Sequence, residues 1–530
     1  MNYDVIKQGS LSKKGIFLCL LSVGIIGLLV RMYFEPYVAL TGDATNYFVY
    51  AADTGLKGKP SDVYFHANSG WSLLLSTLFS VTKYDDPLFL MELQRSLSIF
   101  ISVVTIIPVY LLCRRFFNQS YSLVGASLFL FQPHLIINST LGITEPLFLF
   151  LGISSLTLFL NNNQKIVYAS FAIMGLFTLI RFEGLLFFAI LSIMFFVKYR
   201  NEKRNFLKYP MVLAIFALVL LPVAYSNLET HGRDGFLSEL FDTSVTVYER
   251  FIEGKPGIGD PLYGDASSAN WQNFLTIGIK NMILFSGVAA IPIFVFFVPI
   301  GIILIIKNKN NLKIDFKIVT IILVSITMMI PAFYTYGRGS DDVRFLFMIF
   351  PLLVLISLYG ISKLKTKNNH FIMVSITVAI VLTSFLYLYF KNDMDVDYEN
   401  EVFLITKFIA SKTSLINDNS ADIDYRTSAT IVTDWPNLPT PTSESHIERS
   451  LKLISPTGYN SLIEFVDLSK DKGLTHLAVD GRDHQPEFLR DVFYHDEKYP
   501  YLKIIYDSSE LGMKYHVKIY EIDFVRMYEN

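Results

Sequence analysis

The chain has 530 residues, of which 52% are hydrophobic and only 17% charged, and its mean hydropathy is +0.41. Soluble domains are about one-quarter charged, so this composition excludes an ordinary soluble protein. The formal net charge of −2 shows no basic surplus, which argues against a nucleic-acid partner. Both cysteines, Cys19 and Cys113, lie in apolar runs, so neither a disulfide framework nor a cysteine-based metal site is expected.

Eleven apolar runs approach the length of a membrane-spanning helix, which is about 20 residues. In chain order they cover residues 15–33, 96–113, 121–138, 146–160, 166–180, 184–197, 209–228, 282–306, 318–336, 345–362 and 371–390. The fifth and sixth runs are counted separately, because one helix through both would be about 48 Å long, too long for one crossing. We therefore expect two short helices that meet at Arg181-Phe182-Glu183-Gly184.

Lysine and arginine alternate between the connections of these runs. The positive charge lies at Lys7, Lys13 and Lys14, at Arg114 and Arg115, at Lys165, and in residues 198–208, 307–317 and 363–367. Because cytoplasmic loops carry such charge, the N-terminus is predicted to be cytoplasmic and the chain after residue 390 to lie outside. The first run could be a cleaved signal peptide. An uncleaved anchor fits better, because Arg31 follows its core directly and no small-x-small site precedes Glu35.

Three outer regions are long. The first, residues 34–94, contains an apolar stretch at 71–81 that is too short to span and is expected to lie in the membrane interface. The second, residues 229–276, is rich in Gly, Pro and Asp and reads as a long loop. The third, residues 391–530, is predicted to be an extracytoplasmic α/β domain. Its helical pattern covers 401–410, and its β-rich runs cover 429–433, 476–479, 502–506 and 515–522.

Ionisable residues at the outer ends of spans are costly to keep there, so they are candidate functional residues. They come from different loops but share the outer face: Asp43, His66, Glu92, Arg95, Glu145, Arg181, Glu183, Arg338, Asp341, Asp342 and Arg344. Glu145 precedes Pro146, where a carboxylate complements the helix dipole. However, it is the only charged residue between Arg115 and Lys165, which favours a functional role.

Structural interpretations remain open for several of these residues. Arg181 and Glu183 could simply pair with each other at a helix hairpin. Arg344 begins a helix, where the dipole disfavours a cation, so it either binds an anion or is neutralised by a neighbouring aspartate. His66 is more often a satisfied polar residue than a ligand, and the chain has no HExxH motif or spaced His/Cys set for a metal.

At these residues the sequence resembles the GT-C superfamily of membrane glycosyltransferases, especially the protein O-mannosyltransferase and lipid-A aminoarabinose transferase branch. The resemblance covers about residues 15–359. It rests on residues 42–47 (GDATNY), 66–74 (HANSGWSLL), 95–115, 144–150 (TEPLFLF), 181–188 (RFEGLLFF) and 343–353 (VRFLFMIFPLL). Four features depart from the family pattern. Ala44 stands where mannosyltransferases usually have Glu, the expected prolines after His66 are absent, Phe182 replaces a common Pro, and the Trp-Trp-Asp motif of oligosaccharyltransferases is missing.

The resemblance implies an α-helical polytopic GT-C fold and an inverting hexosyltransferase in the cell membrane. Its donor would be a sugar on a polyprenyl or dolichyl phosphate, and its acceptor a protein, lipid or glycan. Asp43 would be the base for the acceptor hydroxyl. Glu145 would position the acceptor or hold a divalent metal ion together with Asp43. The implied substrate-binding residues are Tyr47, His66, Arg95, Arg181, Glu183 and Arg344, with the arginines facing phosphate oxygens.

Two other classes of protein compete with this interpretation, and a third alternative is an oligosaccharyltransferase-like transfer. A transporter would place ionisable residues near the bilayer midplane, commonly in a repeated layout of broken helices. Here the charges gather at one face and no repeat is visible. A non-catalytic membrane binding protein would explain the tail domain but would not need eleven helices with long outer loops. The pattern therefore favours an enzyme, with a tail that helps to recognise the acceptor.

Overall fold

The computed structural model describes residues 12–35, 40, 43–58, 69–82, 87–201, 205–251, 271–308, 315–363, 369–391, 459–470, 474–480, 486–512 and 516–529. The chain forms two compact units. The first comprises residues 1–35, 59–74 and 93–392, and the second comprises residues 36–58, 75–92 and 393–530. Parts of the first outer loop thus group with the tail, whereas the sequence prediction counts the whole loop with the membrane domain.

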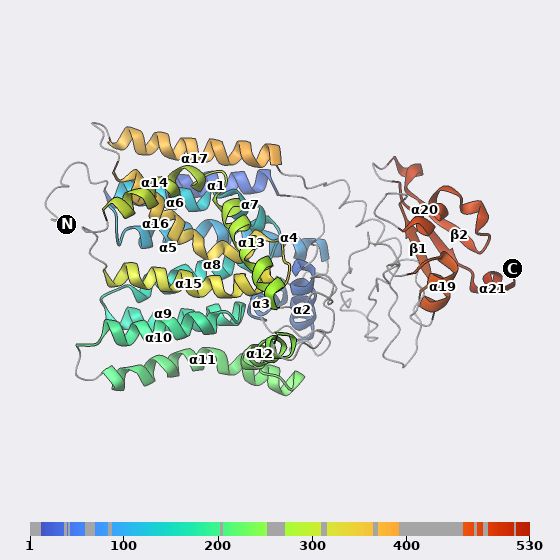
Figure 1. Cartoon of the computed structure of the whole chain (residues 1–530), viewed down its shortest axis with the longest axis horizontal. Helices are drawn as coiled ribbons and strands as arrows, with labels where there is room; N and C mark the ends of the chain where they lie inside the picture. The colour runs from blue at the N-terminus through green and yellow to red at the C-terminus, as the bar shows by residue number, and fades with distance from the viewer. Residues whose placement is uncertain are drawn as a thin grey trace. The chain divides into compact units, whose positions relative to one another are not determined.

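The first unit is a bundle of apolar helices (Figure 1). They are α1 (Lys13–Tyr33), α4 (Pro87–Val104), α5 (Ile106–Cys113), α6 (Gln119–Leu130), α7 (Pro133–Thr140), α8 (Glu145–Phe159), α9 (Gln164–Ile180), α10 (Gly184–Lys198), α11 (Asn205–His231), α12 (Leu237–Phe251), α13 (Trp271–Ala290), α14 (Phe294–Lys307), α15 (Phe316–Gly337), α16 (Phe350–Ile361) and α17 (Asn369–Lys391). Seven segments of the described chain are long and apolar enough to cross a membrane, or eight if the bent pair α6–α7 is one span. The chain is a multi-pass membrane protein, while the count of eleven spans stays a prediction.

Breaks in the helices follow local chemistry. The predicted division at residues 181–183 is confirmed, because α9 ends at Ile180 and α10 begins at Gly184. The α6–α7 pair bends by 52° just before Pro133, which cannot continue the hydrogen bonds of α6. The predicted single helix over 282–306 is wrong. It is two helices, α13 and α14, separated around Pro292 for the same reason.

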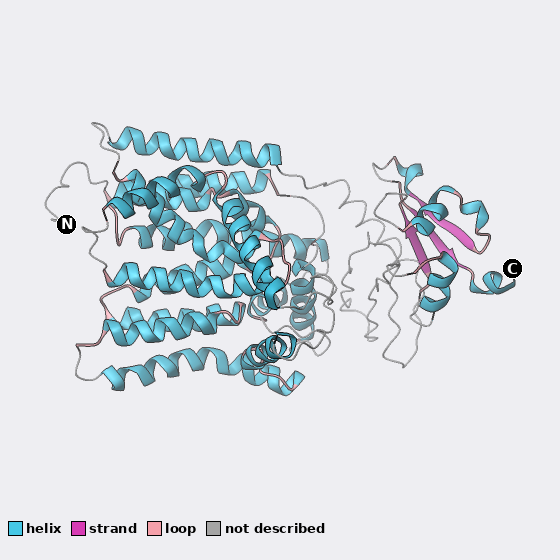
Figure 2. Ribbon diagram, viewed as in Figure 1, coloured by secondary structure: helices cyan, strands magenta, loops and turns pink. Residues whose placement is uncertain are grey.

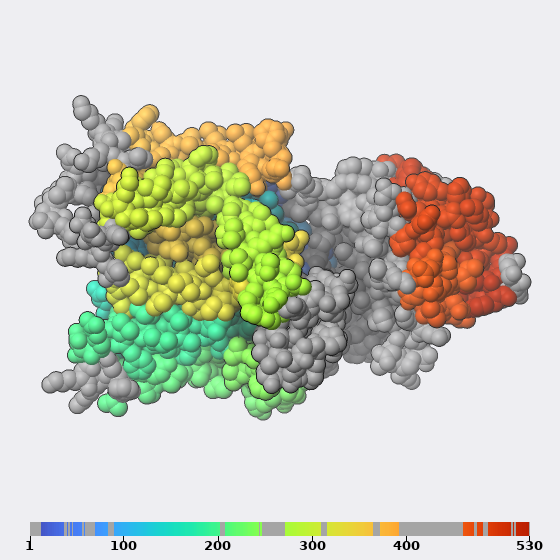
Figure 3. All heavy atoms as spheres, in the orientation of Figure 1, coloured from blue at the N-terminus to red at the C-terminus, as the bar shows by residue number. Residues whose placement is uncertain are grey.

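Close helix contacts in this unit use glycine. A Cβ at Gly175 of α9 would lie 2.7 Å from Val219 Cβ of α11, and one at Gly301 of α14 would lie 2.8 Å from Ile356 Cγ2 of α16. Small residues let membrane helices approach one another closely. Gly301 therefore allows α14 to pack closely on α16. In the same part of the bundle, α13 packs on α15. Figure 3 shows the surface hollowed between these pairs.

The second unit contains α2 (Asp43–Lys57), most of α3 (Gly70–Thr82) and the first residues of α4, up to Glu92. α3 confirms the helix expected over 71–81, whose position in the interface stays a prediction. Phe79 of α3 packs against Phe48 of α2, with ring centroids 5.6 Å apart. A Cβ at Gly55 would lie 2.8 Å from the Ser76 carbonyl oxygen, so the two helices approach closely there.

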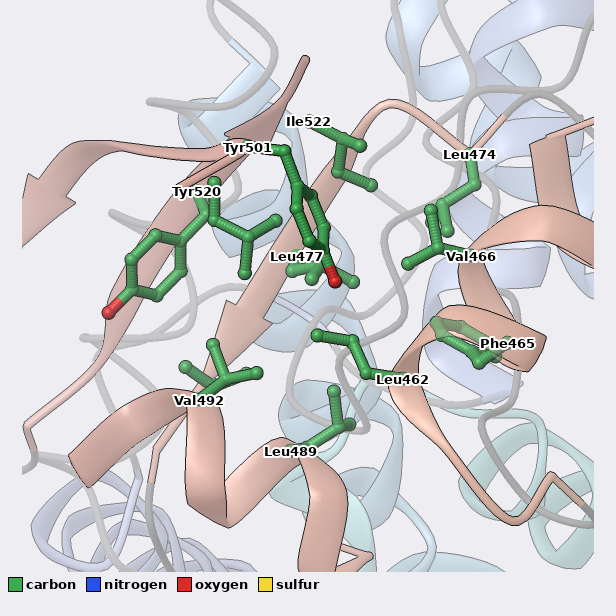
Figure 4. Close-up of a cluster of buried hydrophobic side chains, with 12 residues drawn as sticks. Leu462, Phe465, Val466, Leu474, Leu477, Leu489, Val492, Tyr501, Tyr520 and Ile522 are labelled. Atoms are coloured by element: carbon green, nitrogen blue, oxygen red, sulfur yellow. The ribbon is translucent and has the colours of Figure 1, made fainter. Parts of the chain in front are cut away.

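The described part of the tail forms a small α/β domain (Figure 2). Its strands β1 (His476–Val479), β2 (Leu502–Asp507) and β3 (Lys518–Ile522) form an antiparallel sheet in the order β1-β3-β2. The helices are α19 (Leu462–Lys470), α20 (Glu487–Tyr494) and α21 (Phe524–Glu529). Phe465, Leu477 and Leu489 are among the fully buried side chains of its core (Figure 4). The runs predicted at 401–410 and 429–433 lie outside the described residues.

Candidate functional site

Two carboxylates and one guanidinium meet at one end of the membrane helices. Glu145 is the first residue of α8, Arg181 follows α9, and Glu183 precedes α10. Arg181 Nη1 lies 3.1 Å from Glu145 Oε1, and its Nη2 lies 2.7 Å from Glu183 Oε1. Arg181 Nε also donates to Glu183 Oε1, at 3.1 Å. The ion pair that the sequence left open is therefore present, and it has Glu145 as a third member.

The turn between α9 and α10 determines where Arg181 and Glu183 point. Arg181 leaves α9 with extended backbone (φ −151°, ψ 128°), and the amide of Gly184 donates to its carbonyl at 3.0 Å. A Cβ at Gly184 would lie 2.7 Å from the Cα of Thr178, so a larger residue would open the turn. The Arg-Phe-Glu-Gly sequence thus lets the Arg181 side chain contact both Glu145 and Glu183.

The charged cluster is largely buried and lies over two stacked aromatic rings. The side chains of Glu145, Glu183 and Arg181 are 3%, 9% and 21% exposed. The Arg181 guanidinium lies over the Phe148 ring at 5.3 Å, and that ring stacks on Phe177. Glu183 Oε2 is buried and has no hydrogen-bond partner in the described chain. A buried carboxylate oxygen without a donor is costly, so this oxygen is available to a substrate donor.

A second set of buried polar groups holds the loop that leads to Glu145. Gly142 has φ +76°, a conformation that favours glycine. Its carbonyl accepts from Trp71 Nε1 at 3.2 Å and from Gln94 Nε2 at 2.7 Å. Arg95 Nε donates to the neighbouring Thr140 carbonyl at 3.0 Å. Arg95 therefore contacts the loop before Glu145. Sequence reasoning missed Trp71, Gln94 and Gly142, and a glycine between two helices was the available signal.

Arg344 lies in a 3₁₀ helix, η4 (Val343–Ile349), that packs against α7 and α8. Its Nε lies 3.0 Å from Asp342 Oδ2, and its amide donates to Asp342 Oδ1 at 2.8 Å. Asp342 thus caps η4 and pairs with Arg344, as one of the two interpretations requires. The Arg344 side chain is still 23% exposed, next to the helix that begins with Glu145.

The remaining predicted residues are distributed differently. Asp43 is the exposed first residue of α2 and Tyr47 is half-buried on the same helix, both in the second unit. Their approach to Glu145 stays a prediction, and His66 lies outside the described residues. No group of three or more His, Cys, Asp or Glu in the described chain could hold a metal ion. Glu145 and Glu183 are bridged by Arg181, so these two do not form a metal site by themselves.

One buried cation was not singled out as a site candidate from the sequence. Arg31, in the last turns of α1, is 1% exposed. It donates to Ser102 Oγ of α4, Ser139 Oγ of α7 and the Leu130 carbonyl of α6, each at 3.0 Å. These bonds fasten both halves of the bent α6–α7 pair to α1. The signal was an arginine at the end of the first apolar run, since such residues are rarely kept without a role.

The chain is similar to known glycosyltransferases in sequence and in fold. Residues 89–225 match the family model of dolichyl-phosphate-mannose-protein mannosyltransferases. This segment contains Arg95, Glu145, Arg181 and Glu183. No curated protein matches the chain in sequence.

Solved structures of two membrane transferases are similar over most of the chain. The apo oligosaccharyltransferase of Archaeoglobus fulgidus has a TM-score of 0.56 and 14% identity, covering 93% of this chain and 73% of that one. ArnT from Cupriavidus metallidurans bound to undecaprenyl phosphate has a TM-score of 0.52 and 10% identity, covering 96% and 98%. Archaeal AglB from Archaeoglobus fulgidus, in complex with an inhibitory peptide and a dolichol-phosphate, has a TM-score of 0.52 and 14% identity, covering 94% of this chain and 74% of that one. In its fold and in the sequence of residues 89–225, the chain is thus similar to PMT-like glycosyltransferases of the GT-C superfamily.

Proposed function

We propose that this protein transfers a hexose from a polyprenyl or dolichyl phosphate to a protein, lipid or glycan acceptor at the outer face of the membrane. The observation that carries the proposal is the buried Glu145–Arg181–Glu183 cluster, which lies within the segment matched by the family model. The lipid phosphates bound to ArnT and to AglB support this class of donor. The peptide bound to AglB supports a protein acceptor.

The proposed reaction is a single displacement with inversion. The acceptor oxygen attacks the anomeric carbon, and the bond from that carbon to the phosphate oxygen breaks. The lipid phosphate leaves with the electron pair, so no general acid is needed at the glycosidic oxygen. The acceptor proton passes to a carboxylate, for which we assign Asp43. These steps use only side chains of the protein itself.

The geometry refines the roles of the arginines. The three hydrogen bonds described for Arg181 go to Glu145 and Glu183, so we assign Arg181 to positioning these carboxylates. Glu145 Oε2 accepts a bond of 3.3 Å from Thr144 Oγ1, and we assign Glu145 to orienting the acceptor. Arg344 is partly exposed beside α8 and keeps the planar fork suited to phosphate oxygens.

A transfer assay tests the proposal. The full chain in nanodiscs is supplied with radiolabelled sugars on polyprenyl and dolichyl phosphates and with peptide or glycolipid acceptors. We expect a labelled acceptor and free lipid phosphate, with the anomeric configuration inverted. Asp43→Asn should lower the rate by about 10²- to 10⁴-fold, while donor binding is retained. Asp242→Asn, an exposed carboxylate on α12, is the control.

Two results would contradict the proposal. Retention of the anomeric configuration would exclude a single displacement. Uptake of sugar into sealed vesicles, without any transfer to an acceptor, would favour a transporter. A rate for Asp43→Asn within a few-fold of that of the unchanged protein would remove Asp43 as the base.

A further inference from the structure

α12 exposes its apolar side, whereas Glu239 on the other side of the helix is half-buried. Residues 237, 240, 241 and 245 share one face of the helix by their spacing. Leu237 is 65% exposed, Phe241 69%, and Leu240 and Val245 37% each. Glu239, on the other side, is half-buried, and burial raises its pKa above the usual value. An amphipathic helix of a soluble protein has the opposite arrangement, with its apolar face against the core.

The turn between α11 and α12 is held by two glycines with positive φ, a capping carboxylate and an ion pair. Gly232 (φ +70°) ends α11, and Gly235 (φ +84°) precedes α12. The Asp234 carboxylate accepts from the amides of Leu237 at 2.8 Å and Ser238 at 2.9 Å, which caps the start of α12. Arg233 pairs with Asp242 across this turn at 3.1 Å. The direction of α12 is thereby fixed, and Figure 1 shows it running across the direction of α11.

The exposed apolar surface of α12 continues that of a membrane span. α11 carries an exposed stripe at Leu218 (73%), Leu221 (61%), Tyr225 (68%) and Leu228 (54%), and it is long and apolar enough to cross the bilayer. Such a stripe on a spanning helix faces lipid. α12 begins six residues after α11 ends at His231.

The connectivity also determines the side of the membrane. α10 begins beside Arg181 and leads away from the charged cluster, and α11 returns to the same end. A helix at this end with an outward apolar face matches an interfacial helix, which lies about 5–10 Å deep at the boundary of headgroups and acyl chains. We propose that α12 lies flat in the lipid–water interface on the side of the charged cluster, with Leu237, Leu240, Phe241 and Val245 in the lipid.

Spin labelling tests this placement without any measurement of transfer, so its outcome is independent of the proposed function. The full chain carries Cys19→Ala, while Cys113 is buried and leaves the label to the introduced cysteine. Phe241→Cys is labelled with a nitroxide in nanodiscs, and Asp242→Cys, at the polar edge of the same turn, is the matched control. Collision rates are measured with oxygen, which concentrates in the bilayer, and with a water-soluble nickel chelate.

The interfacial placement predicts that the ratio of oxygen to nickel collisions is several-fold higher at position 241 than at 242. Labels at 237, 240 and 245 should show a ratio as high as that at position 241, so that the ratio varies along the sequence with the period of a helix. Equal access of the nickel chelate to 241 and 242 would overturn the proposal, because α12 would then face water. Protection of 241 from both reagents would also overturn it, because protein would then cover this face.

Discussion

Arg181 joins side chains from two parts of the chain, so its replacement acts first on Glu145 and Glu183. Arg181→Lys keeps the charge but loses the planar fork that reaches both carboxylates. Losing one charge-assisted hydrogen bond costs about 1.5–3 kcal/mol, which corresponds to a rate reduced by about 10- to 100-fold if the bond persists in the transition state. Steady-state transfer kinetics measure this. Arg114→Lys, an exposed arginine that donates to the Phe117 carbonyl, is the control, and equal rates for both variants would remove the positioning role.

Arg344 allows a direct choice between phosphate binding and a structural ion pair. If it binds phosphate, Arg344→Lys should raise the KM for the lipid donor and leave the KM for the acceptor unchanged, because the lost fork faces only the donor. Titrating each substrate separately measures this. If Arg344 serves only its pair with Asp342, then Asp342→Asn should lower the thermal midpoint as much as Arg344→Ala, and donor affinity should not change.

At the scale of elements, the loop between α7 and α8 determines the position of Glu145. Gly142→Ala forces a side chain into the left-handed region, which costs about 1–2 kcal/mol and strains the carbonyl held by Trp71 and Gln94. We expect a lower transfer rate together with a slightly lower thermal midpoint. Gly512→Ala has a similar φ, +66°, in the tail and open space around it, so it should cost stability without loss of rate. Equal transfer rates in the two variants would contradict the role of this loop.

The cap of α12 should respond to acid. Burial alone would raise the pKa of Asp234, but hydrogen bonds from the amides of Leu237, Ser238 and Phe236 outweigh it and hold the pKa below its usual value. The cap's contribution to stability is therefore complete above the unfolded value of about 3.9 and is lost as the pH falls through the lower folded value. The mobility of a spin label at position 241 should rise only in that acidic range. Asp234→Asn should remove this response, and an unchanged titration in that variant would contradict it.

At the scale of the whole molecule, the lysine and arginine pattern predicts that the two ends of the chain lie on opposite sides of the membrane. In a Cys19→Ala background, an impermeant maleimide added outside intact cells should label Ser509→Cys in the tail. Lys13→Cys at the start of α1 should be labelled only after permeabilisation. Both positions are exposed, so burial does not limit the reaction. Labelling of Lys13→Cys in intact cells, without labelling of Ser509→Cys, would reverse the topology.

Helices and strands with strong local patterns were predictable from the sequence. Apolar runs of about 20 residues form helices because every backbone hydrogen bond can be made within the segment. The tail strands at 476–479 and 502–507 also match their predicted runs closely, although their backbone hydrogen bonds are made with β3 and not within each segment. Local patterns were misleading in two places where the helices formed differ from those that the composition predicted. Residues 282–306 are uniformly apolar, yet the helix breaks near Pro292, and α12 lies in a region that its glycines and prolines marked as a loop.

The sequence by itself determined that this is a multi-pass membrane protein, which of its charged residues stand at the ends of its helices, and its resemblance to GT-C transferases. Only the tertiary structure decided which of these charges meet. Glu145 and Arg181 are 36 residues apart, and their ion pair exists because α8 and α9 pack side by side while Gly184 permits the tight turn after α9. Arg31 likewise finds its partners on three other helices. A residue's charge and its place at a helix end are local properties, whereas its partner depends on how distant helices pack.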